Sequence, residues 1–137
     1  VLNCAVNPIC ALTGFRTGEI GNNTDAKIFQ EVIVDEILSL LQAKQISLRD
    51  PDIRSTIAAF SGTIFNKPSM LQHMENGVLT EIDALNGAAV REGKLLGMAL
   101  PYNAAITLLV KATSARSIRS LHGHPTDYET LEAVEKA

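Results

Sequence analysis

Apolar residues recur at steps of three and four along most of the chain, which is the spacing of one face of a helix. The clearest stripe predicts a long helix from Asn23 or Thr24 to about Gln45. Its inward positions are Ala26, Phe29, Val32, Ile33, Ile37, Leu40 and Leu41. No segment alternates apolar and polar residues for long, so no strand is predicted. The pattern therefore indicates an all-α domain of six or seven helices.

Signals at helix ends divide the rest of the chain. The first run, Val1–Thr13, ends at Gly14 and carries an interior Pro8, which should kink the helix and free backbone groups near Asn7. The glycine-rich segment Gly14–Asn23 is interpreted as a connector. Further helices are predicted from Asp50 to Ile64, from Ser69 to Met74, from Thr80 to Gly97, from Pro101 to Arg119 and from Thr126 to Lys136.

Three of these helix starts depend on capping side chains. Asp50 is read as an N-cap followed by Pro51 at the first helical position. Thr80 and Asp83 resemble a capping box, and Ser69 is the expected N-cap of its own short helix. The helix that begins at Pro101 should turn Ile106, Leu109, Val110 and Thr113 inward, and the last helix should do the same with Tyr128, Leu131 and Val134.

The composition fits one domain of 137 residues with an aliphatic core, because 46% of the residues are apolar, 4% are aromatic and none is Trp. The net charge of −3 is spread along the chain, so nothing favours nucleic acid or an anionic membrane as a partner. No segment has the roughly 18 apolar residues of a membrane span, and no secretory signal is present.

The cysteines and histidines give little support for metal chemistry. Cys4 and Cys10 have neither disulfide-motif nor metal-ligand spacing, so we expect two free, buried thiols of a cytoplasmic protein. His122 and His124 form an HxH pattern without a third ligand, and no metal site is predicted. His73 is expected to be solvated or hydrogen-bonded to the backbone.

Two features could belong to a polar site. Asn3 and Asn7 lie one helical turn apart, and buried amides must find partners, which could be neighbouring loops or a ligand. The negative charge of Glu81 near a helix N-terminus would stabilise the helix by about 0.3–1 kcal/mol, which accounts for this residue without a functional site. Ser69 has no nearby His with an obvious orienting partner, so a hydrolase nucleophile is not expected. From the pattern alone, these alternatives stay open.

Three motifs occur in order along the chain. They are Asn-Cys-x-x-Asn-Pro from Asn3 to Pro8, the segments Ser69–Gln72 and Thr80–Gly87, and Gly-x-x-x-Pro-x-Asn from Gly97 to Asn103. Together they resemble the C-terminal domain of the ketopantoate reductases (2-dehydropantoate 2-reductases). The resemblance implies a helical fold of the 6-phosphogluconate dehydrogenase C-terminal-like type.

The resemblance also implies a two-domain enzyme, of which residues 1–137 would be the substrate-side domain. The N-terminal Rossmann domain that binds NADPH would lie outside this chain, in which no GxGxxG is found. The implied reaction is hydride transfer to ketopantoate, which yields pantoate for pantothenate and coenzyme A synthesis. The implied partners are a small 2-keto acid, the Rossmann domain and a second copy of the chain in a homodimer.

Residue roles follow from the resemblance alone. Asn3 and Asn7 match substrate-contacting asparagines, Ser69 matches a serine that holds the substrate carboxylate or hydroxyl, and Asn66 lies where an asparagine is often close to substrate. Glu81 matches a catalytic glutamate beside substrate and cofactor. The family's catalytic lysine would precede Asn3 by one turn, outside the chain, so the isolated chain is expected to be inactive.

Two positions depart from the family pattern. Thr17 stands where many members carry Asn, and His73 stands where an acidic residue is common. These departures leave open a related reductase that acts on another 2-keto acid. A helical interaction or dimerisation module without catalysis is the remaining alternative.

Overall fold

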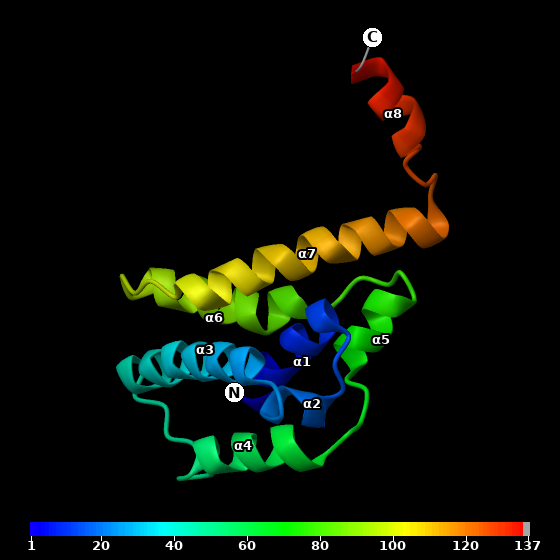
Figure 1. Ribbon diagram of the computed structural model, residues 1–137. Helices are drawn as coiled ribbons and strands as arrows, with labels where there is room; N and C mark the ends of the chain where they lie inside the picture. The colour runs from blue at the N-terminus through cyan, green and yellow to red at the C-terminus, as the bar shows by residue number, and fades with distance from the viewer. Residues whose placement is uncertain (136–137) are drawn as a thin grey trace.

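The computed structural model describes residues 1–135, which form helices and no strand (Figure 1). The helices are α1 (Leu2–Thr13), α2 (Thr17–Gly21), α3 (Thr24–Ala43), α4 (Ile53–Thr63), α5 (Ser69–Glu75), the 3₁₀ helix η1 (Ile82–Ala84), α6 (Asn86–Leu95), α7 (Pro101–His122) and α8 (Tyr128–Glu135). The predicted all-α class is confirmed, although the described residues contain eight α-helices rather than six or seven.

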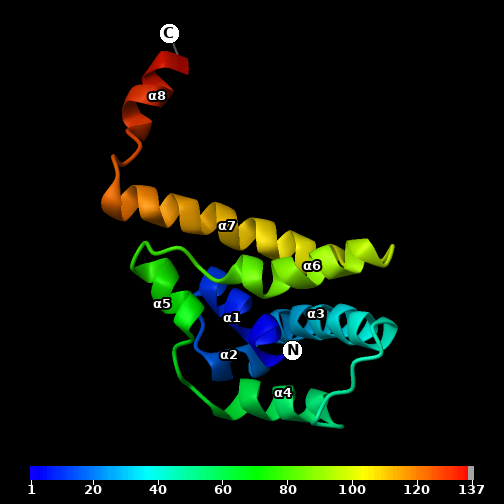
Figure 2. The same cartoon turned by 180° about the vertical axis from the view of Figure 1, so that it is seen from behind.

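Helix α1 is the centre of the fold. It packs against α3, α5 and α7, which lie around it in both views (Figures 1 and 2). Its buried apolar residues are Ala5, Val6, Ile9, Cys10 and Ala11. Gly14 ends it with φ 77°, a left-handed conformation that glycine adopts without strain, so the predicted stop is confirmed.

The long helix α3 matches its predicted stripe and start. The Asn23 side chain accepts a hydrogen bond from the Ala26 backbone N–H at 2.9 Å, which satisfies one free donor of the first turn. Ala26, Ile33, Ile37 and Leu40 are buried in the core. The helix ends at Ala43, two residues before the expected end.

The connector Gly14–Asn23 is not simply a loop, since it contains α2. The Glu19 carboxylate accepts a hydrogen bond from the Arg16 backbone N–H at 2.6 Å, which closes the first turn. Helix α2 packs closely on α4: a side chain at Gly21 would lie 2.7 Å from the Ser61 carbonyl oxygen. The glycines here permit this close approach of two helices.

Pro8 lies inside α1, and the helix continues through it. Because proline has no N–H, the Cys4 carbonyl four residues earlier loses its helical donor. The Asn86 side chain on α6 donates to this carbonyl at 3.0 Å, and the same amide nitrogen donates to the Asn103 side-chain oxygen at 3.0 Å. The predicted free backbone group is therefore real, and its partner is a buried asparagine of the same chain.

The start of α7 is held by a carboxylate from α3. Glu36 accepts the backbone N–H groups of Tyr102 and Asn103, each at 2.9 Å, and the Asn103 side-chain amide at 2.7 Å. Asn103 is fully buried, and its amide also donates to the Ile33 carbonyl at 3.2 Å. The third sequence motif, from Gly97 to Asn103, thus joins α3, α6 and α7.

Two predicted helix starts are wrong. The N-cap of α4 is Asp52, which accepts from the Ser55 N–H at 3.4 Å, whereas Asp50 accepts from the Asp52 N–H at 2.9 Å. The helix therefore begins after the Asp50–Asp52 turn. The helix expected from Thr80 is split into η1 and α6 at Leu85, and no side-chain cap forms at either start. This break directs Asn86 into the core.

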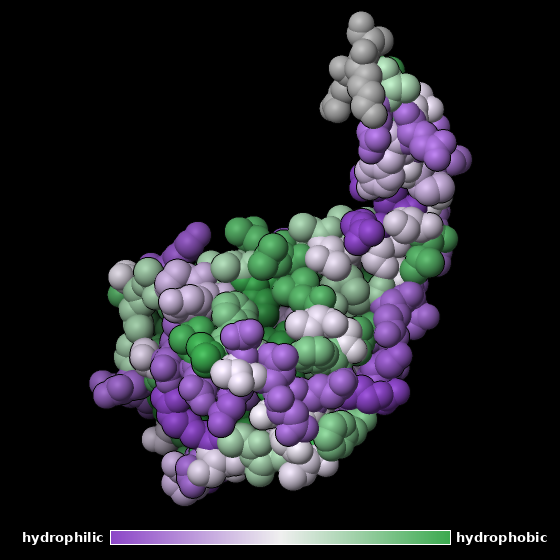
Figure 3. All heavy atoms as spheres, in the orientation of Figure 1, coloured by the Kyte–Doolittle hydropathy of each residue, from purple (hydrophilic) through white to green (hydrophobic). Residues whose placement is uncertain are grey.

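The end of the chain is less packed than expected. Ile106 and Val110 are buried as predicted, but Leu109 is 56% exposed, close to Leu108 at 68%. Apolar side chains gather over α7 in the space-filling view (Figure 3). Helix α8 projects away from the body in both ribbon views, and its apolar residues Tyr128, Leu131 and Val134 are exposed (Figures 1 and 2). The predicted range of this helix ends at Lys136, which lies outside the described residues.

Candidate functional site

Three polar side chains meet between α5 and the segment before η1. The Ser69 hydroxyl donates to Glu81 Oε1 at 3.0 Å, and His73 Nδ1 lies 3.2 Å from Glu81 Oε2. Ser69 and His73 are four residues apart on α5 and so share one face of that helix. We call this group the Ser69–Glu81–His73 cluster.

The cluster corrects three predictions made for its members. Pro68, not Ser69, is the N-cap of α5, because the Ser69 hydroxyl is used by Glu81. Glu81 precedes a 3₁₀ helix and makes no hydrogen bond to a backbone N–H of the described chain. His73 bonds to a carboxylate rather than to the backbone or only to water. Glu81 is therefore the N-cap residue of η1 rather than part of a first helical turn, and its carboxylate does not cap the helix through a hydrogen bond.

The cluster lies at the surface. The side chains of His73 and Glu81 are 42% and 33% exposed. An ion pair this open to water adds only about 0–1 kcal/mol to stability. The arrangement therefore contributes little to folding, while its polar atoms are accessible to a ligand.

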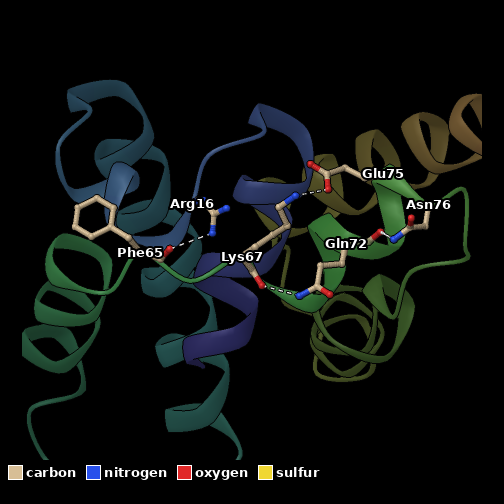
Figure 4. Close-up of polar contacts among 6 residues, drawn as sticks. All are labelled: Arg16, Phe65, Lys67, Gln72, Glu75 and Asn76. Carbon is tan, nitrogen blue, oxygen red and sulfur yellow. Dashed lines mark hydrogen bonds and ion pairs between the residues drawn. The ribbon is translucent and has the colours of Figure 1, made fainter.

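The chain that leads into α5 is held by polar contacts (Figure 4). Arg16 Nη1 donates to the Phe65 carbonyl at 3.3 Å, and Gln72 Nε2 donates to the Lys67 carbonyl at 2.9 Å. Lys67 also pairs with Glu75 at 2.5 Å. These contacts fix the segment from Phe65 to Pro68, and with it the first turn of α5 on which Ser69 lies.

Asn66 lies within this fixed segment. Its carbonyl accepts from the backbone N–H and the hydroxyl of Thr17, at 3.2 and 3.3 Å. Thr17 is fully buried, whereas the Asn66 side chain is exposed and forms no hydrogen bond to the described residues. Asn66 is thus anchored through its backbone, and its amide is left facing solvent.

The two asparagines of α1 differ in exposure. Asn3 is exposed, and Asn7 is buried at 9% exposure. Neither side-chain amide hydrogen-bonds to another residue in the described part of the chain, so bonding to neighbouring loops does not account for them. Helix α1 packs against α5, but no hydrogen bond joins Asn3 or Asn7 to the Ser69–Glu81–His73 cluster.

Both thiols are free, and neither is poised to react. Burial, together with the charge of Glu19, raises the pKa of Cys10 to about 12, and burial also raises the pKa of Cys4. Cys10 is fully buried, but Cys4 is only partly so, which corrects the expectation of two buried thiols. Since the thiolate is the reactive form, these cysteines have a structural role.

Of the two histidines near the end of α7, His122 contacts the backbone of another segment. His122 Nε2 lies 2.9 Å from the Asn76 carbonyl oxygen. Among residues 1–135, no group of three or more His, Cys, Asp or Glu side chains is arranged to hold a metal ion.

None of the helices among residues 1–135 is long and apolar enough to cross a membrane.

His73 is the residue of the cluster that sequence reasoning missed. A usable signal was present, because Ser69 and His73 have the i, i+4 spacing that places two side chains on one helical face. The partner on the other side, Glu81, comes from a different element, so the spacing alone could not identify the contact.

The fold and the cluster together define a class: an all-helical domain that displays a carboxylate held by a hydroxyl and an imidazole. The family model described as ketopantoate reductase PanE/ApbA C-terminal matches residues 1–114. The chain belongs to this family. The match ends within α7, so α8 lies beyond it.

Curated relatives carry the same enzyme name. The chain is 34% identical over 116 residues to a 2-dehydropantoate 2-reductase of Streptococcus pyogenes, covering 83% of this chain and 38% of that protein. It is 31% identical over 121 residues to the enzyme of Aquifex aeolicus, covering 82% and 37%. The chain thus spans less than half the length of these relatives.

Solved structures share the fold. A PanE/ApbA family ketopantoate reductase from Ralstonia eutropha JMP134 aligns with a TM-score of 0.79 at 28% identity, covering 85% of this chain and 39% of that one. D-mandelate dehydrogenase, in a ternary structure with NADH and anilino(oxo)acetate, aligns with a TM-score of 0.76 at 32% identity, covering 85% and 49%.

Proposed function

We propose that residues 1–137 are the substrate-side domain of an NADPH-dependent 2-dehydropantoate 2-reductase. The family membership and the named relatives support this function. The chain spans 37–38% of those two relatives, which fits a protein whose nucleotide-binding domain lies outside these residues. The protein would act in the cytoplasm, in pantothenate and coenzyme A biosynthesis.

The observation that carries the proposal is the placement of Glu81. Both of its carboxylate oxygens already have donors, Ser69 and His73, and the group remains 33% exposed. A carboxylate can accept further hydrogen bonds from a ligand hydroxyl or from a cationic acid, because each oxygen has two acceptor positions. Glu81 would thus meet substrate and cofactor at the surface of the domain.

The residue types predicted to contact substrate suit a small polar keto acid. Reduction of a ketone builds negative charge on its oxygen, which requires hydrogen-bond donors and a proton. Asn3, Asn7 and Asn66 have side-chain amides without partners among the described residues, and the Ser69 hydroxyl, which donates its proton to Glu81, can still accept a hydrogen bond. These groups would bind and orient the substrate, while NADPH would supply the hydride. By the family resemblance, the proton would come from a lysine upstream of Asn3.

The test is steady-state kinetics of the full-length protein with NADPH and ketopantoate. Glu81→Ala and Asn7→Ala should each lower kcat/KM by about tenfold or more, with the melting temperature nearly unchanged. Residues 1–137 alone should show no turnover. If both variants mainly lower the melting temperature and leave kcat/KM intact, the site assignment is wrong.

A second candidate function is reduction of a different 2-keto acid. It is favoured by the similarity to D-mandelate dehydrogenase and by His73, which stands where the family commonly has an acidic residue. A panel of 2-keto acids, with NADPH and NADH compared, separates the two. A kcat/KM at least tenfold higher for an aromatic 2-keto acid than for ketopantoate would favour this second function.

The exposed apolar face of α7 supports a homodimer as a further part of the proposal. Leu108 and Leu109 are 68% and 56% exposed on a helix whose opposite side is in the core. Packing of a second copy of the chain against these two leucines would remove them from water. Sedimentation at increasing concentration should show a dimer, and a monomer throughout would argue against it.

A further inference from the structure

We propose that His73 is a positioning residue for Glu81 and sets the charge of the site as the pH changes. The inference rests on the proposed function for its kinetic test, but its structural part does not. His73 Nδ1 lies 3.2 Å from Glu81 Oε2, while the Ser69 hydroxyl holds Oε1 at 3.0 Å. One helical face of α5 therefore holds both oxygens of a carboxylate that belongs to another element.

Two donors restrict the carboxylate more than one could. A single hydrogen bond from Ser69 would leave the Glu81 side chain free to rotate about its last bond. With His73 donating Nδ1–H to the second oxygen, the plane of the carboxylate is set relative to α5. This is the arrangement that a group needs when it must orient a substrate or a proton donor at the moment of reaction.

The imidazole also brings a property that the hydroxyl lacks. Histidine changes charge between about pH 5 and 8, and in both protonation states it can keep an N–H on Nδ1. Protonated His73 offsets the negative charge of Glu81, and neutral His73 leaves the pair with one negative charge. The hydrogen bond between His73 and Glu81 is thus kept in both protonation states of His73, while the net charge that a ligand meets differs between them.

Several titratable groups on the neighbouring elements are engaged elsewhere. Lys67, which precedes α5, pairs with Glu75 at the end of α5, and Asp83 of η1 pairs with Lys111 of α7 at 2.8 Å. His122 of α7 bonds to the Asn76 carbonyl. On α1, burial raises the pKa of both Cys4 and Cys10, so neither thiol ionises near neutral pH. The pH response of the cluster is therefore assigned to the His73–Glu81 pair.

Three substitutions in the full-length protein distinguish a hydrogen-bond donor at the position of Nδ1 from the space that the His73 side chain fills. His73→Ala removes the donor, His73→Asn keeps an amide N–H near the position of Nδ1, and His73→Gln places its amide nearer the position of Nε2. At pH 7 we expect kcat to fall about tenfold in the Ala and Gln variants and to stay within about threefold in the Asn variant. His124→Asn, an exposed histidine beyond α7, is the matched control.

The pH profile supplies the readout that a merely structural role would not change. Wild type and His124→Asn should share the same pH dependence of kcat/KM, and His73→Asn should change it. Equal kcat in all three His73 variants, or an unchanged pH dependence in His73→Asn, would overturn the proposal.

A measurement without turnover separates this inference from the reductase assignment. The NMR chemical shift of His73 Nδ1 should differ between wild type and Glu81→Gln, since Glu81 Oε2 lies 3.2 Å from that nitrogen. An unchanged chemical shift refutes the pairing whatever the activity. A changed chemical shift in a protein without ketopantoate reductase activity would keep the pairing and reject the proposed function.

Discussion

At the scale of single residues, Asn86 connects the sequence of α1 to the packing of α6 and α7. Its amide nitrogen serves the Cys4 carbonyl, which Pro8 leaves without a helical donor, and the Asn103 side chain. The side-chain oxygen of Asn86 is buried and has no partner among the described residues, which is unfavourable. The two hydrogen bonds donated by its amide nitrogen offset this cost. A buried polar residue of this kind belongs to the structure of the domain rather than to its chemistry.

Asn86→Ala should lower the free energy of unfolding by about 2–4 kcal/mol, since it leaves two buried acceptors unpaired and opens a cavity. Urea unfolding measures the change, with the exposed Asn76→Ala as a control that should cost less than about 1 kcal/mol.

Pro8→Ala provides the sharper comparison. Alanine restores the N–H that the Cys4 carbonyl lacks, so the double variant Pro8→Ala, Asn86→Ala should be less destabilised than the sum of the two single changes. Strict additivity would show that the Cys4 carbonyl is not the partner shared by Pro8 and Asn86.

The candidate site shows what residue patterns can and cannot predict. Asn3, Asn7, Ser69 and Glu81 were named from motifs, and the structure shows that Ser69 and Glu81 are in contact. The contact of His73 with Glu81 depends on where the segment after α5 turns back, and no local pattern encodes that path. The roles of these residues stay predictions, which kinetics must test.

At the scale of the elements, the apolar stripe of α3 was predicted correctly, that of α7 only in part, and the predicted inner face of α8 is exposed. Helix starts were also hard to predict. The start of α3 has a local cap, Asn23, and was predicted. The split at Leu85 was not predicted, because it accompanies a tertiary contact, the hydrogen bond from Asn86 to the Cys4 carbonyl of α1. The cap of α7 was also missed, since Glu36 lies 66 residues before Tyr102 and reaches it only in the folded chain.

Glu36→Ala should destabilise the protein by about 1–2 kcal/mol, because the first turn of α7 loses the acceptor of its N–H groups and a negative charge at its positive end. Glu36→Gln keeps an acceptor without the charge and should cost less. Glu31→Ala, an exposed position on the same helix, is the control. If Glu36→Ala and Glu31→Ala have the same urea midpoint, the carboxylate does not cap α7.

At the scale of the whole molecule, the core is built around α1, and α8 is separate from it. The cluster of buried residues draws on α1, α2, α3, α5, η1 and α7. In α8 the apolar residues Tyr128, Leu131 and Val134 are 61%, 55% and 71% exposed, and the family match ends at residue 114. The amphipathic pattern correctly predicted the helix, but a pattern does not specify which surface an apolar face will meet.

A protein that ends at Pro125 should therefore keep the melting temperature of the intact chain within about 2 °C at low protein concentration, because side chains that stay in water add little to folding. Val110→Ala, in the buried face of α7, is the contrasting variant and should lower the melting temperature by about 5 °C or more. The opposite outcome is that the truncation itself lowers the melting temperature by that amount. If the difference in melting temperature between the intact and the truncated protein also increases with protein concentration, then α8 packs on a second copy. In that case the separate position of α8 would describe only the monomer, and the dimer would have to include α8 as well as the exposed leucines of α7.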